Sequence, residues 1–179
     1  MTTEVKTPPS LTSRMWRALK LEDALYEEVE HDPAAGRQAL YIIALVSIAQ
    51  SIGRSAETVI VGRPLGNIVL TGLFGFIETT IGLAIWSYIL YYIGTKIFKG
   101  VATPQEVWRT TGFARSPGVF FIIPFIGFLV NIWVIIAYVK ASKHALDISM
   151  GKTILAAIVS ALPFLIIQGL VVLLLAQLL

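Results

Sequence analysis

Glu78 is the only acidic residue inside a predicted apolar span of this 179-residue sequence. A charged side chain at the centre of a bilayer costs about 2.5 to 3.5 kcal/mol on insertion scales, so Glu78 needs a partner or a hydrated position. Three interpretations are open: a structural pair with Arg54 or Arg63, proton or ion handling, and contact with another subunit. We weigh the structural pair above the other two.

Small and polar residues in the apolar segments predict close helix packing. Thr71, Gly75 and Gly82 lie within roughly 60° of the acidic side chain on a helix with about 100° per residue, so a second helix could approach closely. Buried amides in membranes usually form hydrogen bonds between helices. The predicted helix-packing residues are therefore Thr71, Gly75, Glu78, Gly82, Asn131 and Gln168.

Other residue types that carry catalytic or ligand-binding chemistry lack the pattern they need. The chain has no cysteine, and His31 and His144 have no second ligand at i+3 or i+4, so no metal site is expected. Residues 151–153, GKT, match only the end of a phosphate-binding loop, because Leu146 stands where that motif needs Gly. No hydrolase or intramembrane-protease motif occurs. We predict a protein that is not an enzyme and binds no cofactor.

The composition indicates an all-α integral membrane protein. Apolar residues make up 56% of the chain and charged residues 14%, which is too hydrophobic for a soluble domain. Each membrane-spanning helix needs about 20 apolar residues, so the length suits one compact bundle. We predict a cytoplasmic tail over residues 1–36 and a transmembrane bundle over 37–179. The five hydrophobic segments of the bundle are 38–53, 68–95, 112–123, 127–140 and 153–178.

The stretch TGFARSPGVFFIIPFIG, residues 111–127, decides how often the chain crosses the membrane. Pro117, Pro124 and Gly127 weaken any single helix through it. One crossing leaves nine Lys and Arg residues on the cytoplasmic side and five outside, whereas two crossings give twelve and two, which fits the positive-inside rule better. We predict a short broken hairpin around Pro124 to Gly127, a cytoplasmic N-terminus and an extracytoplasmic C-terminus. The first arm is too short to cross fully unless it is tilted or re-entrant.

The N-terminal segment predicts an amphipathic helix that lies in the membrane interface. A helix capped by Ser10 or Thr12 would place Met15 and Trp16 on an apolar face flanked by basic residues. The basic residues near the cytoplasmic ends of the spans set the topology, and they could also contact anionic lipid headgroups. The residues predicted at headgroups or at the interface are Arg14, Trp16, Arg17, Lys20, Lys96, Lys99, Arg109 and Arg115.

These features resemble the Ypt-interacting, or Yip-domain, family of small polytopic membrane proteins, in a prokaryotic-type form. The resemblance rests on the acidic run LEDALYEEVEHDP, on TGFARSP, and on the turn IIPFIG followed by a span that contains Trp133. It covers about residues 20–179 and implies a five-span bundle with a cytoplasmic N-terminus. The residues of the hairpin and signature are Gly112, Phe113, Pro117, Pro124 and Gly127.

The resemblance also implies a non-catalytic adaptor. Eukaryotic relatives bind prenylated Rab-type GTPases in vesicle traffic, but this chain has Phe113 where the signature often has Tyr, and it lacks the Pro/Gln-rich cytosolic extension. We expect a prokaryotic plasma-membrane protein that packs against lipids and other integral membrane subunits, with neither a Rab-type GTPase nor a nucleic acid as partner. The alternatives are a proton- or ion-coupled transporter or channel that uses Glu78, and a membrane-shaping protein.

Overall fold

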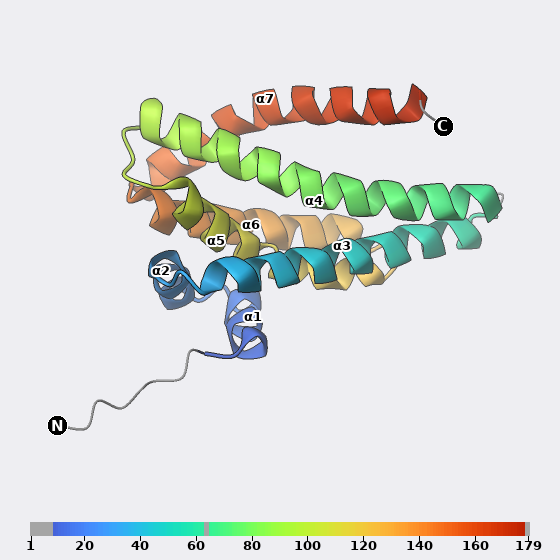
Figure 1. Ribbon diagram of the computed structural model, residues 1–179, viewed down its shortest axis with the longest axis horizontal. Coiled ribbons are helices and arrows are strands. Elements are labelled where there is room, and N and C mark those ends of the chain that lie inside the picture. Colours follow the sequence, from blue (N-terminus) through green and yellow to red (C-terminus); the bar gives the residue numbers. More distant parts are fainter. Residues whose placement is uncertain (1–8, 63–64, 178–179) are drawn as a thin grey trace.

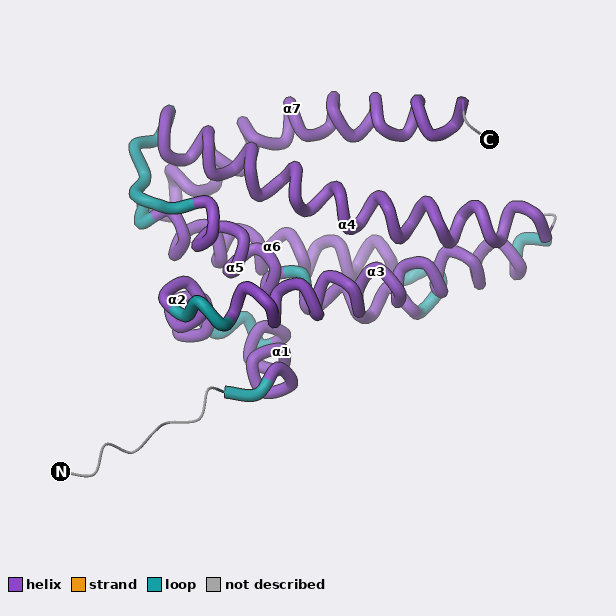
Figure 2. Tube along the Cα trace, in the orientation of Figure 1, coloured by secondary structure: helices purple, strands orange, loops and turns teal. Residues whose placement is uncertain are grey.

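The computed structural model of the chain describes residues 9–62 and 65–177. The side chains of residues 65–67, 70, 71, 78, 172 and 175–177 lie outside this description. All regular structure in the described part is helical, and the long helices run back and forth along one axis (Figures 1 and 2). In chain order the elements are α1 (Leu11–Leu19), α2 (Asp23–His31), α3 (Ala35–Ile60), α4 (Leu65–Lys96), α5 (Pro104–Ala114), the 3₁₀-helix η1 (Ser116–Ile122), α6 (Gly127–Leu146) and α7 (Met150–Gln177).

Within the described residues, four helices are long and apolar enough to cross a membrane. They cover Ala35–Ile60, Gly72–Lys96, Gly127–Leu146 and Met150–Val171. The all-helical membrane fold is therefore confirmed, but the predicted segments 38–53 and 112–123 are not spans with those bounds. The first is too short because α3 continues past Arg54 to Ile60, with no helix-breaking residue in residues 54–61. The second is not one helix, since it comprises the end of α5 followed by η1.

A polar stripe along α3 holds α4 against it. Ser51 Oγ donates a hydrogen bond to the Gly72 carbonyl at 2.7 Å, and Ser47 Oγ lies 3.1 Å from Thr80 Oγ1. A Cβ atom added to Gly72 would lie 3.1 Å from Ser55 Oγ, so the glycine permits the close approach. Membrane helices associate through such small residues and interhelical hydrogen bonds, because lipid tails are as apolar as the helices themselves.

The chain between α4 and α6 forms an arm, made of α5 and η1, that lies along α3. A Cβ atom on Gly53 would come within 1.9 Å of the Phe121 carbonyl oxygen, and one on Gly112 within 2.6 Å of Ala39 Cβ. Both positions therefore require glycine. Pro117 lacks an amide hydrogen and cannot extend the α5 hydrogen-bond ladder, which explains why η1 follows. The chain then turns at residues 123–126, and α6 begins at the predicted Gly127.

The two short helices α1 and α2, residues 11–31, form a unit that we call the N-terminal cap. Ser10, one of the two predicted caps, accepts a hydrogen bond from the Ser13 amide and starts α1. Trp133 Nε1 on α6 donates to the Leu19 carbonyl at 3.1 Å and ties the cap to the bundle. The signature residue Phe113 is fully buried where the cap meets α3 and α6. Its hydrophobic cluster includes Ala18, Leu25, Tyr26, Val29, Ala39 and Ala137.

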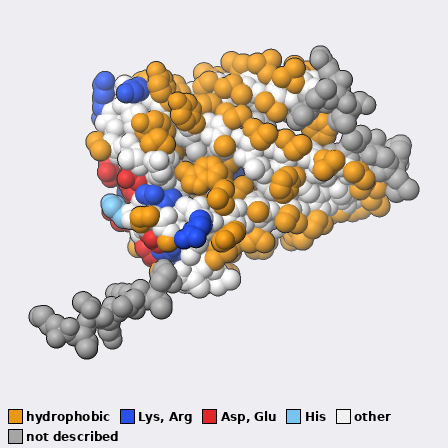
Figure 3. All heavy atoms as spheres, in the orientation of Figure 1, with side chains coloured by type: hydrophobic (Ala, Val, Ile, Leu, Met, Phe, Trp, Pro, Cys, Tyr) orange, Lys and Arg blue, Asp and Glu red, His pale blue; other side chains and the backbone are white. Residues whose placement is uncertain are grey.

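Charged side chains gather at the end of the bundle that carries the N-terminal cap, and hydrophobic side chains cover most of the remaining visible surface (Figure 3). Exposed apolar residues along α3 run from Leu40 and Tyr41 to Ile60, a rise of about 28 to 30 Å. This distance matches the roughly 30 Å hydrocarbon core of a bilayer. Gln50 lies near the middle of this apolar band. The first long helix, α3, starts at the end of the bundle that carries the N-terminal cap, and the last, α7, finishes at the opposite end (Figure 1).

Candidate functional site

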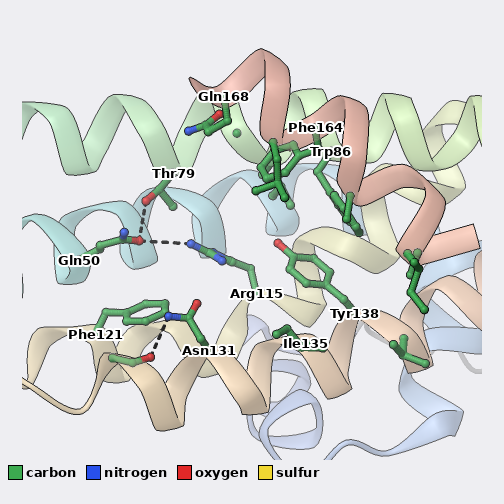
Figure 4. Close-up of a pocket in the computed structure, with 18 of the residues that line it drawn as sticks. Gln50, Thr79, Trp86, Arg115, Phe121, Asn131, Ile135, Tyr138, Phe164 and Gln168 are labelled. Carbon is green, nitrogen blue, oxygen red and sulfur yellow. Dashed lines mark hydrogen bonds between the residues drawn. The ribbon is translucent and has the colours of Figure 1, made fainter. Parts of the chain in front are cut away.

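A cavity of about 840 Å³ lies between α4, α6 and α7, with α3 and η1 at its base. Figure 4 shows its side chains converging from these elements. The base includes Gln50, so the cavity lies at the depth of the apolar band. Its apolar walls include Leu83, Ile135, Ile154, Ile158, Phe164 and Leu165. We call this feature the lateral cavity.

The base of the lateral cavity contains a positive charge in a network of neutral partners. Gln50 Oε1 accepts hydrogen bonds from Thr79 Oγ1 at 2.6 Å and from Arg115 Nη2 at 3.2 Å (Figure 4). The Arg115 guanidinium also lies over the Phe121 ring, 5.5 Å from its centroid. A guanidinium at this depth is costly and is a functional-site candidate by default.

Three polar atoms around the lateral cavity have no hydrogen-bond partner among the described residues. They are Arg115 Nε, Trp86 Nε1 and Gln168 Oε1. Trp86 packs edge-to-face on Phe164 of α7, with ring centroids 5.4 Å apart, so its indole is held in place while its N–H stays unpaired. A buried polar group without a partner costs about 1 to 3 kcal/mol. A ligand that offered partners to these atoms would recover part of that free energy.

Two further ionisable residues of α3, Arg54 and Glu57, line the cavity, although they lie between the predicted segments 38–53 and 68–95. Glu57 accepts a hydrogen bond from the Phe125 amide at 2.8 Å and so fixes the turn between η1 and α6. Arg54 lies against α4, where a Cβ atom on Gly75 would be 3.3 Å from its Cδ. The polar residues of α3 recur at helical spacing, namely Ser47, Gln50, Ser51, Arg54, Ser55 and Thr58. This periodicity in the sequence indicates that the helix continues past Arg54.

The predicted small-residue face of α4 contacts two different helices. Gly75 faces α3, whereas a Cβ atom on Gly82 would lie 3.5 Å from Gln168 Oε1 on α7. Asn131 Nδ2 donates to the Gly127 carbonyl of its own helix at 2.8 Å, so this donor makes no bond between helices, and the packing role of Asn131 stays a prediction. The side chains of Thr71 and Glu78 lie outside the described residues. The pairing of Glu78 therefore stays a prediction.

The basic residues predicted at lipid headgroups divide into two groups. Arg14 is buried and Arg115 lies at the depth of Gln50, so the headgroup prediction is wrong for these two, whereas Arg109 is half-buried at the charged end of the bundle and its assignment stays a prediction. Arg109 donates to the carbonyls of Val29 and Glu30, at the end of α2. Arg17 pairs with Glu22 and Glu28. The residues left exposed, for which the prediction stands as made, are Trp16, Lys20, Lys96 and Lys99.

Arg14 is the centre of the charge network in the N-terminal cap. It is only 1% exposed and donates to Glu28, Asp32 and Gln38 at 2.8, 2.6 and 2.7 Å. Burial raises the pKa of Glu28, but hydrogen bonds from Arg17 and Arg14 outweigh it and leave that pKa below its usual range. Burial likewise raises the pKa of Asp32, and the hydrogen bond from Arg14 outweighs it, so this pKa is also lowered.

The pKa of Glu30, also in the cap, is shifted in the opposite direction from those of Glu28 and Asp32. Its side chain is 4% exposed, and its Oε2 has no hydrogen-bond partner in the described residues. Burial, reinforced by the nearby negative charge of Asp147, raises the pKa of Glu30 to about 7. No group of three or more His, Asp or Glu residues in the described part of the chain is arranged as a metal site.

Four apolar spanning helices, a buried glycine-lined arm and a charged cap at one end define a small polytopic membrane protein. The family model of the Yip1 domain matches residues 22–173, and the chain therefore belongs to the Yip1 domain family. The match begins at the acidic helix α2 and includes the signature residues Gly112, Phe113 and Pro117, so the predicted family is confirmed. Comparison with curated proteins and with solved structures gave no match.

Proposed function

We propose that this Yip1-domain protein is a non-catalytic membrane adaptor or accessory subunit, and that α7 carries the surface that packs against another integral membrane protein. One observation carries the proposal. In the apolar window of α7 only 11% of residues are buried within the protein, compared with 35% to 44% in the other three candidate spans. The helix α7 therefore contributes little to the core of its own fold.

The chemistry of α7 suits a protein partner in the membrane. No charged residue occurs from Thr153 to the end of the chain. Its outward side chains include Leu162, Ile166 and Leu173, each more than three-fifths exposed. Helices in a bilayer associate through close van der Waals packing, for which a rigid apolar helix with an unused face is well suited.

The distribution of charge supports one orientation. The end of the bundle that carries the N-terminal cap also carries Lys96, Lys99, Lys140, Lys143 and Lys152, near the ends of α4, α6 and α7. Under the positive-inside rule this end faces the cytoplasm, so α7 finishes on the opposite side. The arm made of α5 and η1 then enters the membrane as a fifth and shortest segment, and α6 returns to the cytoplasmic end. We assign the protein to a prokaryotic plasma membrane, with lipids and integral membrane subunits as its partners.

A second candidate function is proton- or ion-coupled transport that uses Glu78. It is favoured by the location of Arg54, Glu57 and Arg115 along the cavity, since ionisable residues at bilayer depth often mark ion pathways. Glu78→Gln should abolish such transport in proteoliposomes while leaving the protein assembled. An unchanged proton flux in this variant would remove the transport hypothesis.

The adaptor proposal is tested by purification of the full chain from native membranes in mild detergent, followed by mass spectrometry. The wild type should retain one integral membrane protein in fixed stoichiometry. A triple variant of α7, Leu162→Ala with Ile166→Ala and Leu173→Ala, should bind this partner at least about tenfold more weakly. A loss of roughly 1.4 kcal/mol of packing free energy corresponds to a tenfold loss of affinity. The matched variant of α3, Leu45→Ala with Ile48→Ala and Ile52→Ala, should retain it. Equal retention by both variants would contradict the proposal.

A further inference from the structure

We propose that the lateral cavity binds a single-chain amphiphile with a carboxylate end, that is, a free fatty acid. The carboxylate would lie against Arg115, and the hydrocarbon chain would leave between α6 and α7 toward the bilayer. This site is independent of the partner surface proposed for the outward face of α7.

The size and lining of the cavity fit a small apolar ligand. Small-molecule sites typically measure about 300 to 1,000 Å³, have mostly apolar walls and contain a few polar groups that fix orientation. The lateral cavity has a volume of about 840 Å³ and combines aliphatic and aromatic walls with a polar base. Because the cavity lies at bilayer depth and its walls are apolar, its natural occupant is a hydrocarbon chain.

The polar base of the cavity fits an anion. Arg115 carries a positive charge, its hydrogen bond to Gln50 is to a neutral amide, and its Nε donor has no partner among the described residues. A guanidinium binds a carboxylate through two parallel charge-assisted hydrogen bonds, which are about twice as strong as neutral ones. Trp86 also lines the cavity, and its buried indole N–H is a further donor without a partner among the described residues.

The position of Arg115 favours a compact head. Its partner Gln50 is nine residues beyond Tyr41, so the guanidinium lies about 14 Å along α3 from that edge of the apolar band. A phospholipid headgroup would have to bring its phosphodiester and a second chain to this depth. A fatty acid brings one carboxylate and one chain. Glu57 also lines the cavity, seven residues or about 10 Å of helix rise beyond Gln50, and its carboxylate is engaged by the Phe125 amide.

The test is binding of tritiated oleate to the purified full chain in detergent micelles, measured by scintillation proximity. Oleate should bind saturably, and unlabelled oleate should compete. Arg115→Gln should weaken binding by about 10- to 100-fold, the loss expected for a hydrogen bond to a charged group. Lys96→Gln removes an exposed cation outside the cavity and should leave binding unchanged.

A second pair of variants keeps Arg115 intact, in case its replacement disturbs the network with Gln50. Ala157→Phe fills the cavity from α7 and should abolish oleate binding, whereas Leu162→Phe, on the outward face of the same helix, should not affect it. Unchanged binding in both Arg115→Gln and Ala157→Phe would overturn the site. Equal binding of oleyl alcohol would overturn the carboxylate assignment, and stronger competition by phosphatidylglycerol than by oleate would overturn the choice of a single-chain ligand.

Discussion

The side of the bundle that carries the arm and the N-terminal cap is packed without spare room, whereas the side that carries α7 is open. A Cβ atom on Gly53 would lie 1.9 Å from a backbone oxygen, but one on Gly169 of α7 would meet nothing within 4 Å. The hydrogen bonding of polar side chains differs between the two sides in the same way. Arg14 in the cap uses three of its nitrogens in hydrogen bonds, while Gln168 Oε1 beside the cavity has no partner in the described residues. The packed side holds the fold together, and the proposed partner surface and ligand cavity both lie on the open side.

The largest expected effect follows from breaking the packed side at Gly53. Gly53→Ala forces the Phe121 carbonyl away from α3 and should lower the free energy of unfolding by about 3 kcal/mol or more, because backbone atoms cannot rotate aside. Gly169→Ala is the matched control on the open side and should be neutral or stabilising by up to about 1 kcal/mol. Thermal unfolding in detergent, followed by circular dichroism, measures both. Equal melting temperatures would remove the distinction between the two sides.

The next effect is expected from Arg14→Gln in the N-terminal cap. The substitution removes the main partner of Asp32 and one of the two arginine partners of Glu28, which keeps Arg17, and both carboxylates are partly exposed, so solvent limits the loss to about 1 to 3 kcal/mol. The pKa values of both carboxyls are lowered in the folded protein, so this stabilisation is present above their usual pKa and is lost as pH falls through the lowered values. Lys20→Gln, at an exposed cation, should change stability by less than about 0.5 kcal/mol. A loss for Arg14→Gln that did not shrink in acid would contradict the ion-pair explanation.

Glu30→Gln should have a smaller, pH-dependent effect of opposite sign. Because burial raises the pKa of Glu30 to about 7, the folded state holds a proton that the unfolded state releases at lower pH. Wild-type stability should therefore fall as pH rises from about 4.5 to 7, the interval between the usual and raised values. The glutamine variant stays neutral, so it should match the wild type at pH 4 and melt higher at pH 8. A pH-independent difference between the two proteins would refute this account.

The smallest expected effect concerns an unpaired amide on the open side. Gln168→Leu removes an oxygen that has no partner in the described residues, so the variant should lie within about 1 kcal/mol of the wild type or be more stable. Gln50→Leu is the matched comparison, because its oxygen accepts hydrogen bonds from Thr79 and Arg115 and its loss should cost about 1.5 to 3 kcal/mol. Unfolding in a denaturing detergent titration compares the pair. A larger loss at Gln168 would show that the open side is more tightly held than its contacts indicate.

Much of the fold could be predicted because membranes impose strong local rules. Apolar length located four spanning helices, and the cap at Ser10 and the start of α6 at Gly127 followed from local chemistry. The predicted first segment, 38–53, ends too early, because α3 continues past Arg54 to Ile60. The charge of Arg54 is tolerated because the residues around it form a polar stripe against α4. The sequence of α3 alone does not show that α4 packs there.

The candidate site was less predictable, because it depends on which elements meet. Arg115 follows a short helix and precedes Pro117, so its sequence context is that of an interfacial loop. The arm instead carries it along α3 to Gln50, at the middle of the apolar band. Likewise, the headgroup prediction for Arg14 failed because its carboxylate partners lie 14 and 18 residues away in sequence. Contacts of this kind need tertiary structure.

The most direct test of the central claim, that α7 is the partner surface, is photocrosslinking in native membranes. A photoreactive amino acid is placed at Ile166 or Leu173 on the outward face of α7, and at Leu45 or Ile48 on α3 as controls of similar exposure class. The adaptor account predicts one discrete crosslink to a different integral membrane protein from the α7 positions and none from α3. Crosslinks to lipid alone from all four positions, or the same protein crosslinks from both helices, would contradict it.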